Sequence, residues 1–527
     1  MSDTFLFNER RNALAFWLGS AVVAIGVLLH LPMFWMARDM DFMLAGMPMD
    51  AGMLWGMALI VAGIGLAGYG LLPKGADKAA LHEALTPPEN APLTRAHWIV
   101  MTVLSMALII DIMKPASLGF VTPGMRVEYG VNAATVALLP FSALVGTVVG
   151  SFVWGALADL YGRRAAILLS SVMFIGTSIC GAMPSFWWNV LMCFLMGAAA
   201  GGMLPVTYAL LAEIMPTRHR GWCLVLVGGI GAVGGYLASS MLSALLQPLF
   251  GWRIMWFLNF PTGLILIALS PLIPESARFL QQMGRATEAR QVLLRFGAVI
   301  ATAPEDDDRD SDAADDHTPL PPNLPGFVGT TIALTLAALA WGLVNFGVLL
   351  WLPGVLVAEG RSMGLASAII AKSTLFAAPA VVAVAWLYSV WSTKWTLVTT
   401  IAITTLGLLA VLLRGSEGSS ILSNPILPLA LLIVGSTGVI SILLPYTAEN
   451  YPLKVRGRAT GWVAGCSKLG GLIAQGLSVM ALIPALDIAA VSIAVPAALS
   501  LLLIAMLGHE TRHRDLRELE VAATKSV

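Results

Sequence analysis

Long apolar runs recur from one end of this 527-residue chain to the other, and they constrain its fold more than any other feature. Each run is about 20 residues long, which is enough to cross the hydrocarbon core of a membrane as a helix. Inside lipid, only helices and closed barrels satisfy their backbone hydrogen bonds. Hydrophobic residues make up 58% of the chain and charged residues only 11%, whereas a soluble domain carries about 25% charged residues. The sequence therefore predicts an all-α polytopic membrane protein.

Run lengths predict about fourteen membrane-spanning helices in three groups. Two spans lie near 13–37 and 50–72, six lie between 98 and 273, and six lie between 327 and 507. The first run is too long for the core of a signal peptide, so we expect a retained helix. The expected segments are two extra helices with a methionine-rich turn (1–90), a six-helix bundle (91–273), a central loop (274–325), a second six-helix bundle (326–508) and a tail (509–527).

Basic residues predict the orientation. Most of the 30 Lys and Arg residues fall in loops on the same side as the N-terminus. Because basic loops stay in the cytoplasm, we expect both termini there, in a bacterial inner membrane. The central loop ends in PEDDDRDSDAADDHTPLPPNLP, an acidic and proline-rich stretch that predicts a disordered linker. It lacks the spaced ligands and the glycine of a calcium-binding EF-hand.

A short repeat relates the two bundles. LAEIMPTRHRGW starts at Leu211 and TAENYPLKVRGR starts at Thr447, each at the inner end of the fourth helix of its bundle. The matching residues, at a constant offset of 236, are Ala212, Glu213, Pro216, Arg220 and Gly221 in the first copy and Ala448, Glu449, Pro452, Arg456 and Gly457 in the second. Two similar halves around a central loop are typical of transporters whose bundles rock about a site at the membrane midplane.

The stretch GALADLYGRR, from Gly155 to Arg164, resembles the signature loop of the major facilitator superfamily. Here Gly155 permits close helix packing and Gly162 permits a tight turn. The resemblance implies a twelve-helix fold and a cytoplasmic gate, in which Asp159, Arg163 and Arg164 form a latch that favours the outward-open state. The predicted gate also includes the charged residues of the repeat, which are Glu213, Arg220, Glu449 and Arg456. The corresponding loop of the second half, YSVWSTKW, keeps one lysine and has lost the acid.

Further stretches resemble the sugar porters and the metabolite:proton symporters of that superfamily. They are PVTYALLAEIMPTRHRG, GWR at 251–253, PESARFL at 274–280 and HETRHRDLREL in the C-terminal tail. IIDIMKPASLGFVTP resembles helix 1 of the aromatic-acid:proton symporters, whose pattern is two aspartates three positions apart, then GF and a proline. Asp111 and the later GF and proline fit this pattern, but Lys114 stands where the second aspartate is expected. The resemblance covers residues from about 95 to 520 and leaves the first two helices unexplained.

Asp111 and Lys114 are the strongest candidates for a transport site. A charge at bilayer depth costs at least a few kcal/mol, so such residues are usually paired or functional. The two residues lie three positions apart on one helix face, and Pro115 removes a backbone hydrogen bond beside them. They either face a substrate cavity or form an ion pair that only satisfies itself. Lys468, in GCSKLGGLIAQG, is another lysine at mid-helix, and it either lines the cavity or pairs with backbone.

Two lysines in one cavity suit an organic anion. Tyr208 and Asn345 are predicted to add hydrogen bonds, and Trp341 and Trp351 an apolar wall, although aromatic residues in membrane helices also serve as packing. We therefore predict a secondary transporter for a small carboxylate or similar metabolite. Proton coupling follows if Asp111 takes up a proton when the anion engages the lysines.

Other functions remain open from the sequence. Methionines crowd the turn between the first two helices, and thioethers select Cu(I), so a metal or metal-chelate transporter is one alternative. A sugar or drug transporter of the same superfamily is another, and a receptor that keeps the fold without transport is a third. The sequence carries no nucleotide loop, nucleophile motif or His/Cys/Asp metal constellation, so we expect no enzyme and no cofactor. Without a basic tract we expect no nucleic acid, and the expected partners of a monomer are substrate, protons and lipid.

Overall fold

The computed structural model describes residues 10–71, 85–86, 92–300, 327–412, 425–451, 453–482 and 486–512, which lie mostly in helices. Thirteen helical spans among these residues are long and apolar enough to cross a membrane. A further helix, α21 (Leu453–Val479), has 27 residues and is about 40 Å long, which is also enough to cross. This confirms the predicted all-α membrane protein of about fourteen spans. The predicted acidic linker lies outside the described residues.

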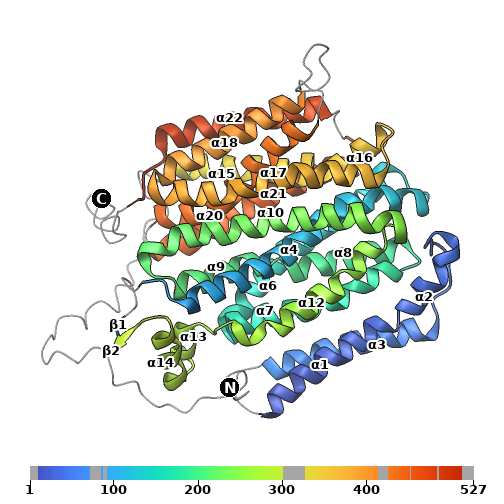
Figure 1. Ribbon diagram of the computed structural model, residues 1–527, viewed down its shortest axis with the longest axis horizontal. Helices are drawn as coiled ribbons and strands as arrows, with labels where there is room; N and C mark the ends of the chain where they lie inside the picture. The colour runs from blue at the N-terminus through green and yellow to red at the C-terminus, as the bar shows by residue number, and fades with distance from the viewer. Residues whose placement is uncertain are drawn as a thin grey trace, which may run out of the picture.

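The helices form an N-terminal hairpin and two bundles (Figure 1). The hairpin contains α1 (Arg10–Leu28), α2 (Leu31–Met36), η2 (Ala37–Met40) and α3 (Ala51–Leu71). The first bundle contains α4 (Arg95–Glu128), α5 (Ala133–Val136), α6 (Leu138–Tyr161), α7 (Arg163–Gly176), η3 (Thr177–Ala182), α8 (Phe186–Ala200), α9 (Met203–Ile214), α10 (Thr217–Phe250), α11 (Ile254–Phe257), α12 (Asn259–Ala268) and η4 (Ser270–Leu272). The second bundle contains α15 (Val328–Leu343), the π-helical turn η6 (Val344–Val348), α16 (Leu349–Ala358), α17 (Met363–Val390), α18 (Thr393–Leu412), α20 (Ile426–Asn450), α21 and α22 (Leu486–Leu507).

Short elements of the central loop lie at one end of the bundles (Figure 1). They are the amphipathic helices α13 (Ala277–Gln282) and α14 (Ala286–Arg295) and the two-residue strand β2 (Val299–Ile300). The strand β2 pairs antiparallel with β1 (Leu85–Thr86), so Leu85 lies opposite Ile300. We call this end of the molecule, at which α1 begins and the described C-terminal segment ends, the loop end. The opposite end, with α2 and α16, is called the far end.

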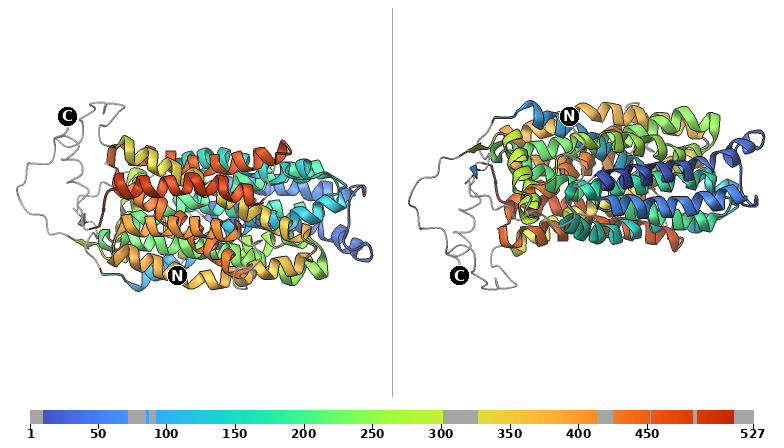
Figure 2. Two further views of the ribbon diagram at one scale, coloured as in Figure 1. Left: turned by 90° about the horizontal axis from the view of Figure 1, so that it is seen from above. Right: turned by 90° about the horizontal axis from the view of Figure 1, so that it is seen from below.

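The extra hairpin packs against the first bundle. Its two long helices approach closely because glycines face each other: a Cβ on Gly63 would lie 2.7 Å from the carbonyl oxygen of Gly19. Both α1 and α3 contact α7. Figure 1 places the hairpin on the side of the first bundle that is remote from the second bundle, and the right-hand view of Figure 2 shows it on the outer surface. The hairpin is therefore an addition to the first bundle.

At the far end the two bundles are in close contact. A Cβ on Gly119 of α4 would lie 2.6 Å from the carbonyl oxygen of Leu350 in α16. The hydroxyl of Tyr236 in α10 donates a 2.8 Å hydrogen bond to the carbonyl oxygen of Leu349. Ser243 of α10 and Ser367 of α17 are joined by a hydrogen bond of 2.8 Å. Backbone approach and interbundle hydrogen bonds thus close this end.

Toward the loop end, α6 and α21 move apart. Near the far end, a Cβ on Gly476 of α21 would lie 3.8 Å from the ring of Phe141 in α6. Nearer the loop end, a Cβ on Gly155 of α6, or on Gly457 or Gly461 of α21, would meet nothing within 4 Å. The close packing expected at Gly155 is therefore absent in this conformation, in which the bundles are closed at the far end and separated between α6 and α21 at the loop end.

Candidate functional site

Asp111 and Lys114 lie midway along α4, and both are buried, with 6% and 1% of their surfaces exposed. They form no ion pair with each other in the described part of the chain. Instead, Nζ of Lys114 lies 2.9 Å from the ring centroid of Phe174 on α7, an attractive cation–π position. Neither Oδ1 of Asp111 nor Nζ of Lys114 has a hydrogen-bond partner among the described residues. The self-satisfied ion pair considered from the sequence is therefore not formed in this structure.

Lys468 brings a second positive charge from the other bundle. It lies on α21, and its Nζ is 5.1 Å from the ring centroid of Phe346 in η6. The Asp111 carboxylate lies close enough to both Lys114 and Lys468 to be attracted electrostatically by their ammonium groups. Because buried charges are costly without a partner, one carboxylate near two ammonium groups leaves one positive charge without a matching negative charge. The structure thus brings together three of the five predicted binding residues, from both bundles.

A π-helical turn forms one wall of this region. The turn η6 interrupts the α15–α16 span over five residues, and π-turns occur frequently at functional sites. It holds Phe346 beneath Lys468, and the side-chain amide of Gln475 on α21 donates a hydrogen bond to the carbonyl oxygen of Phe346. Asn345, a predicted binding residue, is half-buried within the same turn.

The remaining predicted binding residues have different surroundings. Tyr208, on α9, is buried in the apolar cluster of the first bundle, with its hydroxyl packed against Gly228 of α10. Trp341 uses its indole N–H to donate a 2.9 Å hydrogen bond to the carbonyl oxygen of Ser436, a contact within the second bundle. The indole nitrogen of Trp351 is buried without a hydrogen-bond partner among the described residues. The indole N–H of Trp351 is therefore an unused donor among the described residues.

Three residues near the charges were missed from the sequence: Phe174, Phe346 and Gln475. The two phenylalanines carry no sequence signal that separates them from packing residues. Gln475 does carry one, since a buried amide two helical turns after Lys468 shares its helix face and needs a partner.

The predicted latch lies at the loop end of the first bundle. Arg163 donates to Asp159 at 3.0 Å and forms a longer ion pair of 3.5 Å with Glu213. The Asp159 side chain is 75% exposed, so this pair contributes little to stability. Both partners of Arg163 belong to its own bundle. The latch residues are therefore grouped, without an ion pair from Asp159 to the second bundle among the described residues.

A buried carboxylate holds the start of α7. Gly162 adopts φ +100°, which only glycine tolerates readily, and turns the chain from α6 into α7. The carboxylate of Glu275, in PESARFL, accepts hydrogen bonds from the backbone N–H groups of Arg163 (2.8 Å) and Arg164 (3.3 Å). Arg164 also donates a 2.7 Å hydrogen bond to the carbonyl oxygen of Ser270. Burial raises the pKa of Glu275 above its ordinary value of 4.5, although these N–H donors oppose the shift.

The second bundle has an equivalent contact. The carboxylate of Glu510, in HETRHRDLREL, accepts hydrogen bonds from the backbone N–H (3.0 Å) and the hydroxyl (2.6 Å) of Thr393 at the start of α18. A third hydrogen bond comes from the hydroxyl of Ser392. Burial raises the pKa of Glu510, but the hydrogen bonds from Ser392 and Thr393 outweigh it and leave the pKa below 4.5. Each bundle therefore caps its third spanning helix with a distant glutamate.

The other predicted gate residues are distributed over both bundles. Glu449 accepts hydrogen bonds from the hydroxyls of Tyr388 (2.6 Å) and Thr511 (2.7 Å). Arg456 donates a 3.3 Å hydrogen bond to the carbonyl oxygen of Tyr451. Arg220 is half-buried in the first turn of α10, next to Gly221, whose Cβ would lie 2.7 Å from Glu449. The loop ends of α10 and α20 therefore stay in contact across the bundles.

The methionine-rich turn has two kinds of methionine. Met33 and Met53 are buried in the cluster that joins the hairpin to the first bundle, whereas Met36, Met40 and Met43 are exposed. The described residues contain no group of three or more His, Cys, Asp or Glu side chains arranged to hold a metal ion. The buried methionines thus act as packing between hairpin and bundle.

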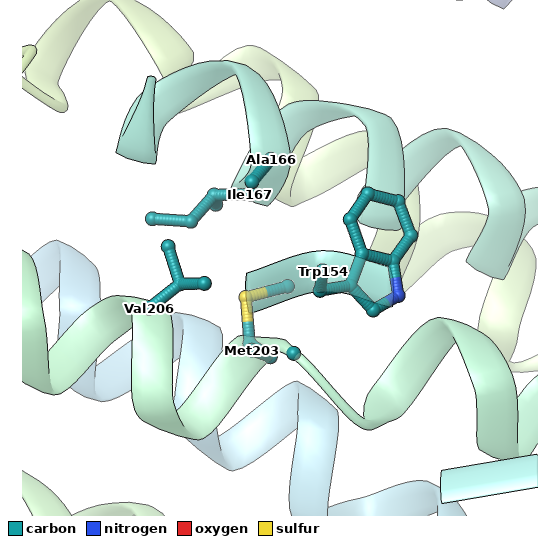
Figure 3. Close-up of a pocket in the computed structure, with 6 residues that line it drawn as sticks. Trp154, Ala166, Ile167, Met203 and Val206 are labelled. Atoms are coloured by element: carbon teal, nitrogen blue, oxygen red, sulfur yellow. The ribbon is translucent and has the colours of Figure 1, made fainter. Parts of the chain in front are cut away.

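Figure 3 shows a small pocket whose lining includes none of the three charged residues. Its lining is Trp154, Ala166, Ile167, Gly202, Met203 and Val206. The indole N–H of Trp154 is already used, because it donates a 2.7 Å hydrogen bond to the carbonyl oxygen of Ala198. An apolar lining without a free donor or acceptor makes this pocket a gap in the packing of the first bundle.

Comparisons with known proteins agree with this architecture. Residues 96–475 match the family described as the Major Facilitator Superfamily. The niacin transporter NiaP of Acinetobacter baylyi is 24% identical over 389 residues, which cover 73% of this chain and 87% of that protein. The 4-hydroxybenzoate transporter PcaK of Pseudomonas putida is 28% identical over 391 residues, which cover 72% of this chain and 85% of that protein. A solved structure of the proton:xylose symporter XylE bound to 6-bromo-6-deoxy-D-glucose matches with a TM-score of 0.63 and 16% identity, over 81% of this chain and 98% of that one.

Proposed function

The chain belongs to the major facilitator superfamily and is a membrane transporter, and from that premise we propose that it carries a small aromatic carboxylate by alternating access. The observation that carries the proposal is the group of charges formed by Asp111, Lys114 and Lys468. Two ammonium groups around one carboxylate leave a net positive charge, which would attract an organic monoanion. Similarity to transporters named for niacin and 4-hydroxybenzoate supports the same substrate class.

The aromatic part of the substrate would lie beside η6. The Phe346 ring lies beneath the ammonium group of Lys468, and the unused indole N–H of Trp351 offers a hydrogen-bond donor. Asn345 adds an amide from the same turn. A ring with one carboxylate and a polar substituent suits such a wall, because small-molecule sites combine apolar surface with a few placed polar groups.

We infer that the loop end faces the cytoplasm, because most basic residues lie in the loops on that side. The separation of α6 and α21 then corresponds to an inward-facing conformation. An outward-facing conformation would bring Asp159 against the second bundle and part α4 from α16. Under this proposal Asp159, Arg163 and Arg164 form the latch of the outward-facing state, and Glu213, Arg220, Glu449 and Arg456 support it.

Proton coupling would use Asp111. In the empty site its carboxylate is stabilised by the two lysines. An anion that engages the lysines would compete with the Asp111 carboxylate for their charge, so the less stabilised carboxylate would take up a proton. Anion and proton would then cross together, and the loaded site would keep the charge of the empty one.

Ligand-induced thermal stabilisation of the purified transporter tests the substrate class. We expect 4-hydroxybenzoate and nicotinate to raise the unfolding temperature, because a ligand that binds only the folded state stabilises it. The matched neutral ligands 4-hydroxybenzamide and nicotinamide should give no shift. Equal stabilisation by acid and amide would contradict the proposal, and stabilisation by xylose or by Cu(I) alone would favour a sugar or a metal substrate instead.

A further inference from the structure

We propose that the turn of the extra hairpin is a clamp on the far end of α4, and that Glu128 is the positioning residue through which it acts. The clamp consists of Leu44 and Ala45 in the turn, Glu128 at the end of α4, and Trp252 and Arg253 before α11. Its effect is to hold α4 against α16, so that the far end stays closed while the loop end is open. The hairpin would thereby bias the transport cycle without touching substrate.

Both oxygens of the Glu128 carboxylate are saturated. Oε1 accepts the backbone N–H groups of Leu44 (2.6 Å) and Ala45 (3.0 Å) and pairs with the Arg253 guanidinium at 2.6 Å. Oε2 accepts the indole N–H of Trp252 at 2.8 Å and the Nε–H of Arg253 at 3.3 Å. The side chains of Glu128 and Arg253 are 3% and 1% exposed. Because a buried charge is stable only when it is paired and hydrogen-bonded, removing any donor leaves the Glu128 carboxylate partly unsatisfied and lowers stability.

The remaining donors of Arg253 tie the clamp to the first bundle. Its Nη1 donates to the carbonyl oxygens of Gly181 (3.1 Å) and Met183 (2.9 Å), and its Nη2 also donates to the hydroxyl of Tyr129 (2.9 Å). The turn itself adds a hydrogen bond from the backbone N–H of Gly46 to the carbonyl oxygen of Pro184 at 3.1 Å. The hairpin turn, α4 and the loops around η3 and α11 therefore meet at one buried ion pair.

The turn adopts a conformation that needs support from its surroundings. Asp41 and Phe42 have φ values of +52° and +58°, which are uncommon for residues other than glycine. The Phe42 ring stacks on Phe34 at 4.8 Å and meets the edge of Phe250, at the end of α10, at 5.8 Å. Phe34 in turn packs against Phe257 of α11 at 4.9 Å. The turn is thus fixed by aromatic packing as well as by the carboxylate.

The far segment of α4 depends on being held because two prolines interrupt its backbone. Pro115 and Pro123 lie inside the helix and lack the N–H group that would bond to the preceding turn. Helices bend most readily at such positions. The contact of Gly119 with Leu350 lies between the two prolines, and Glu128 lies beyond the second. The position of this segment is therefore set from its end, where the clamp acts.

Alkylation of a cysteine at the closed contact tests the clamp. The Leu350→Cys variant places a thiol at a position that is 8% exposed, and the four native cysteines are all buried. In detergent solution, adding Glu128→Gln should raise the rate of maleimide labelling at least about tenfold, because the neutral amide loses the ion pair and the far end opens more often. Ala45→Pro, which removes one N–H donor from the turn, should raise the rate in the same direction.

Two variants separate positioning from general stability. Asp41→Asn changes a carboxylate in the same turn, keeps a residue that tolerates positive φ, and should leave labelling unchanged. Tyr446→Phe removes a 2.7 Å hydrogen bond to His509 in the second bundle, so it should lower the unfolding temperature without raising the labelling rate. If Glu128→Gln and Ala45→Pro lower the unfolding temperature but leave labelling as slow as in Leu350→Cys alone, the clamp proposal is wrong. No substrate is added, so this failure would leave the proposed function untouched.

Discussion

The two bundles start their third spanning helices in the same way but hold them with different partners. In the first bundle Glu275 caps α7 beside Arg163 and Arg164, and Asp159 adds an exposed ion pair. In the second bundle Glu510 caps α18 through hydroxyl and backbone donors of Ser392 and Thr393. The capping position of the helix is what both bundles need, because the first N–H groups of a helix have no partner inside it. In the first bundle the cap is accompanied by the ion pair of Asp159 with Arg163, and under the proposed function the movable latch belongs to that bundle.

The same asymmetry appears at the site. The first bundle contributes Asp111 and the fully buried Lys114, whereas the second contributes the less buried Lys468. We infer that the first bundle fixes the chemistry of the site and that the second completes it as the bundles rock.

We expect the largest difference in ligand affinity between the variants of Lys114 and Lys468. Lys114→Ala should weaken binding of 4-hydroxybenzoate about 100-fold, because a hydrogen bond to a charged group contributes about 1.5–3 kcal/mol and no water easily replaces a buried ammonium. Lys468→Ala should weaken binding of 4-hydroxybenzoate about tenfold, since water can replace the less buried ammonium group of Lys468. Titration calorimetry measures both, with Lys372→Ala on the exposed face of α17 as the control. An equal loss of binding affinity in all three variants would contradict the roles assigned to Lys114 and Lys468.

Transport rate tests the latch. Asp159→Asn should slow transport about tenfold and leave ligand affinity and the unfolding temperature nearly unchanged, because exposed ion pairs contribute only about 0.2–1 kcal/mol to stability. The control is Glu288→Gln, which breaks the ion pair of Glu288 with Arg285 (2.6 Å) in the central loop. A normal transport rate for Asp159→Asn, measured in proteoliposomes, argues against the latch.

Removing the helix caps Glu275 and Glu510 should lower the stability of the protein by amounts that differ less than these effects. Glu275→Ala and Glu510→Ala each remove a helix cap, which typically costs about 0.5–2 kcal/mol. We expect the larger loss for Glu275→Ala, because it also leaves the buried Arg164 guanidinium without its nearby carboxylate. Denaturation of both variants in the same detergent compares them, and a greater loss for Glu510→Ala would reverse the proposed order.

The smallest effect is a difference in pH dependence. The pKa of Glu275 lies above 4.5 in the folded protein, so its contribution to stability falls as pH rises from 4.5 through that raised pKa. The pKa of Glu510 lies below 4.5, so its contribution is complete above 4.5 and is lost as pH falls through the lowered pKa. Unfolding temperatures between about pH 3.5 and 7 should therefore change slope in opposite directions for Glu275→Gln and Glu510→Gln. Identical profiles for the two variants would contradict this contrast.

The fold was predictable from the sequence to a large extent, because lipid leaves so few options for the backbone. Apolar run length gave the spans, and the repeat gave the two bundles. The division of single spans was not predictable: η6 interrupts the α15–α16 span within a uniformly apolar run, and nothing in that run distinguishes a π-turn from an α-helix.

The site was predictable only in its charges. A charged residue in an apolar helix is a conspicuous signal, so Asp111, Lys114 and Lys468 could be selected as candidates. Their partners were not, because a phenylalanine under an ammonium group has the same sequence appearance as one in the core. The contact of Glu128 with the hairpin turn was also missed, since it joins residues more than 80 positions apart through backbone N–H groups that every residue carries.

The Asp111→Asn variant tests most directly whether Asp111 couples anion and proton movement. We expect this variant still to exchange labelled 4-hydroxybenzoate across proteoliposome membranes in counterflow, because the lysines remain. We also expect that it no longer accumulates the substrate along a pH gradient, because an amide cannot take up the coupled proton. If Asp111→Asn accumulates substrate along a pH gradient as the unmodified protein does, Asp111 only balances the charge of the lysines and proton coupling by this residue is contradicted.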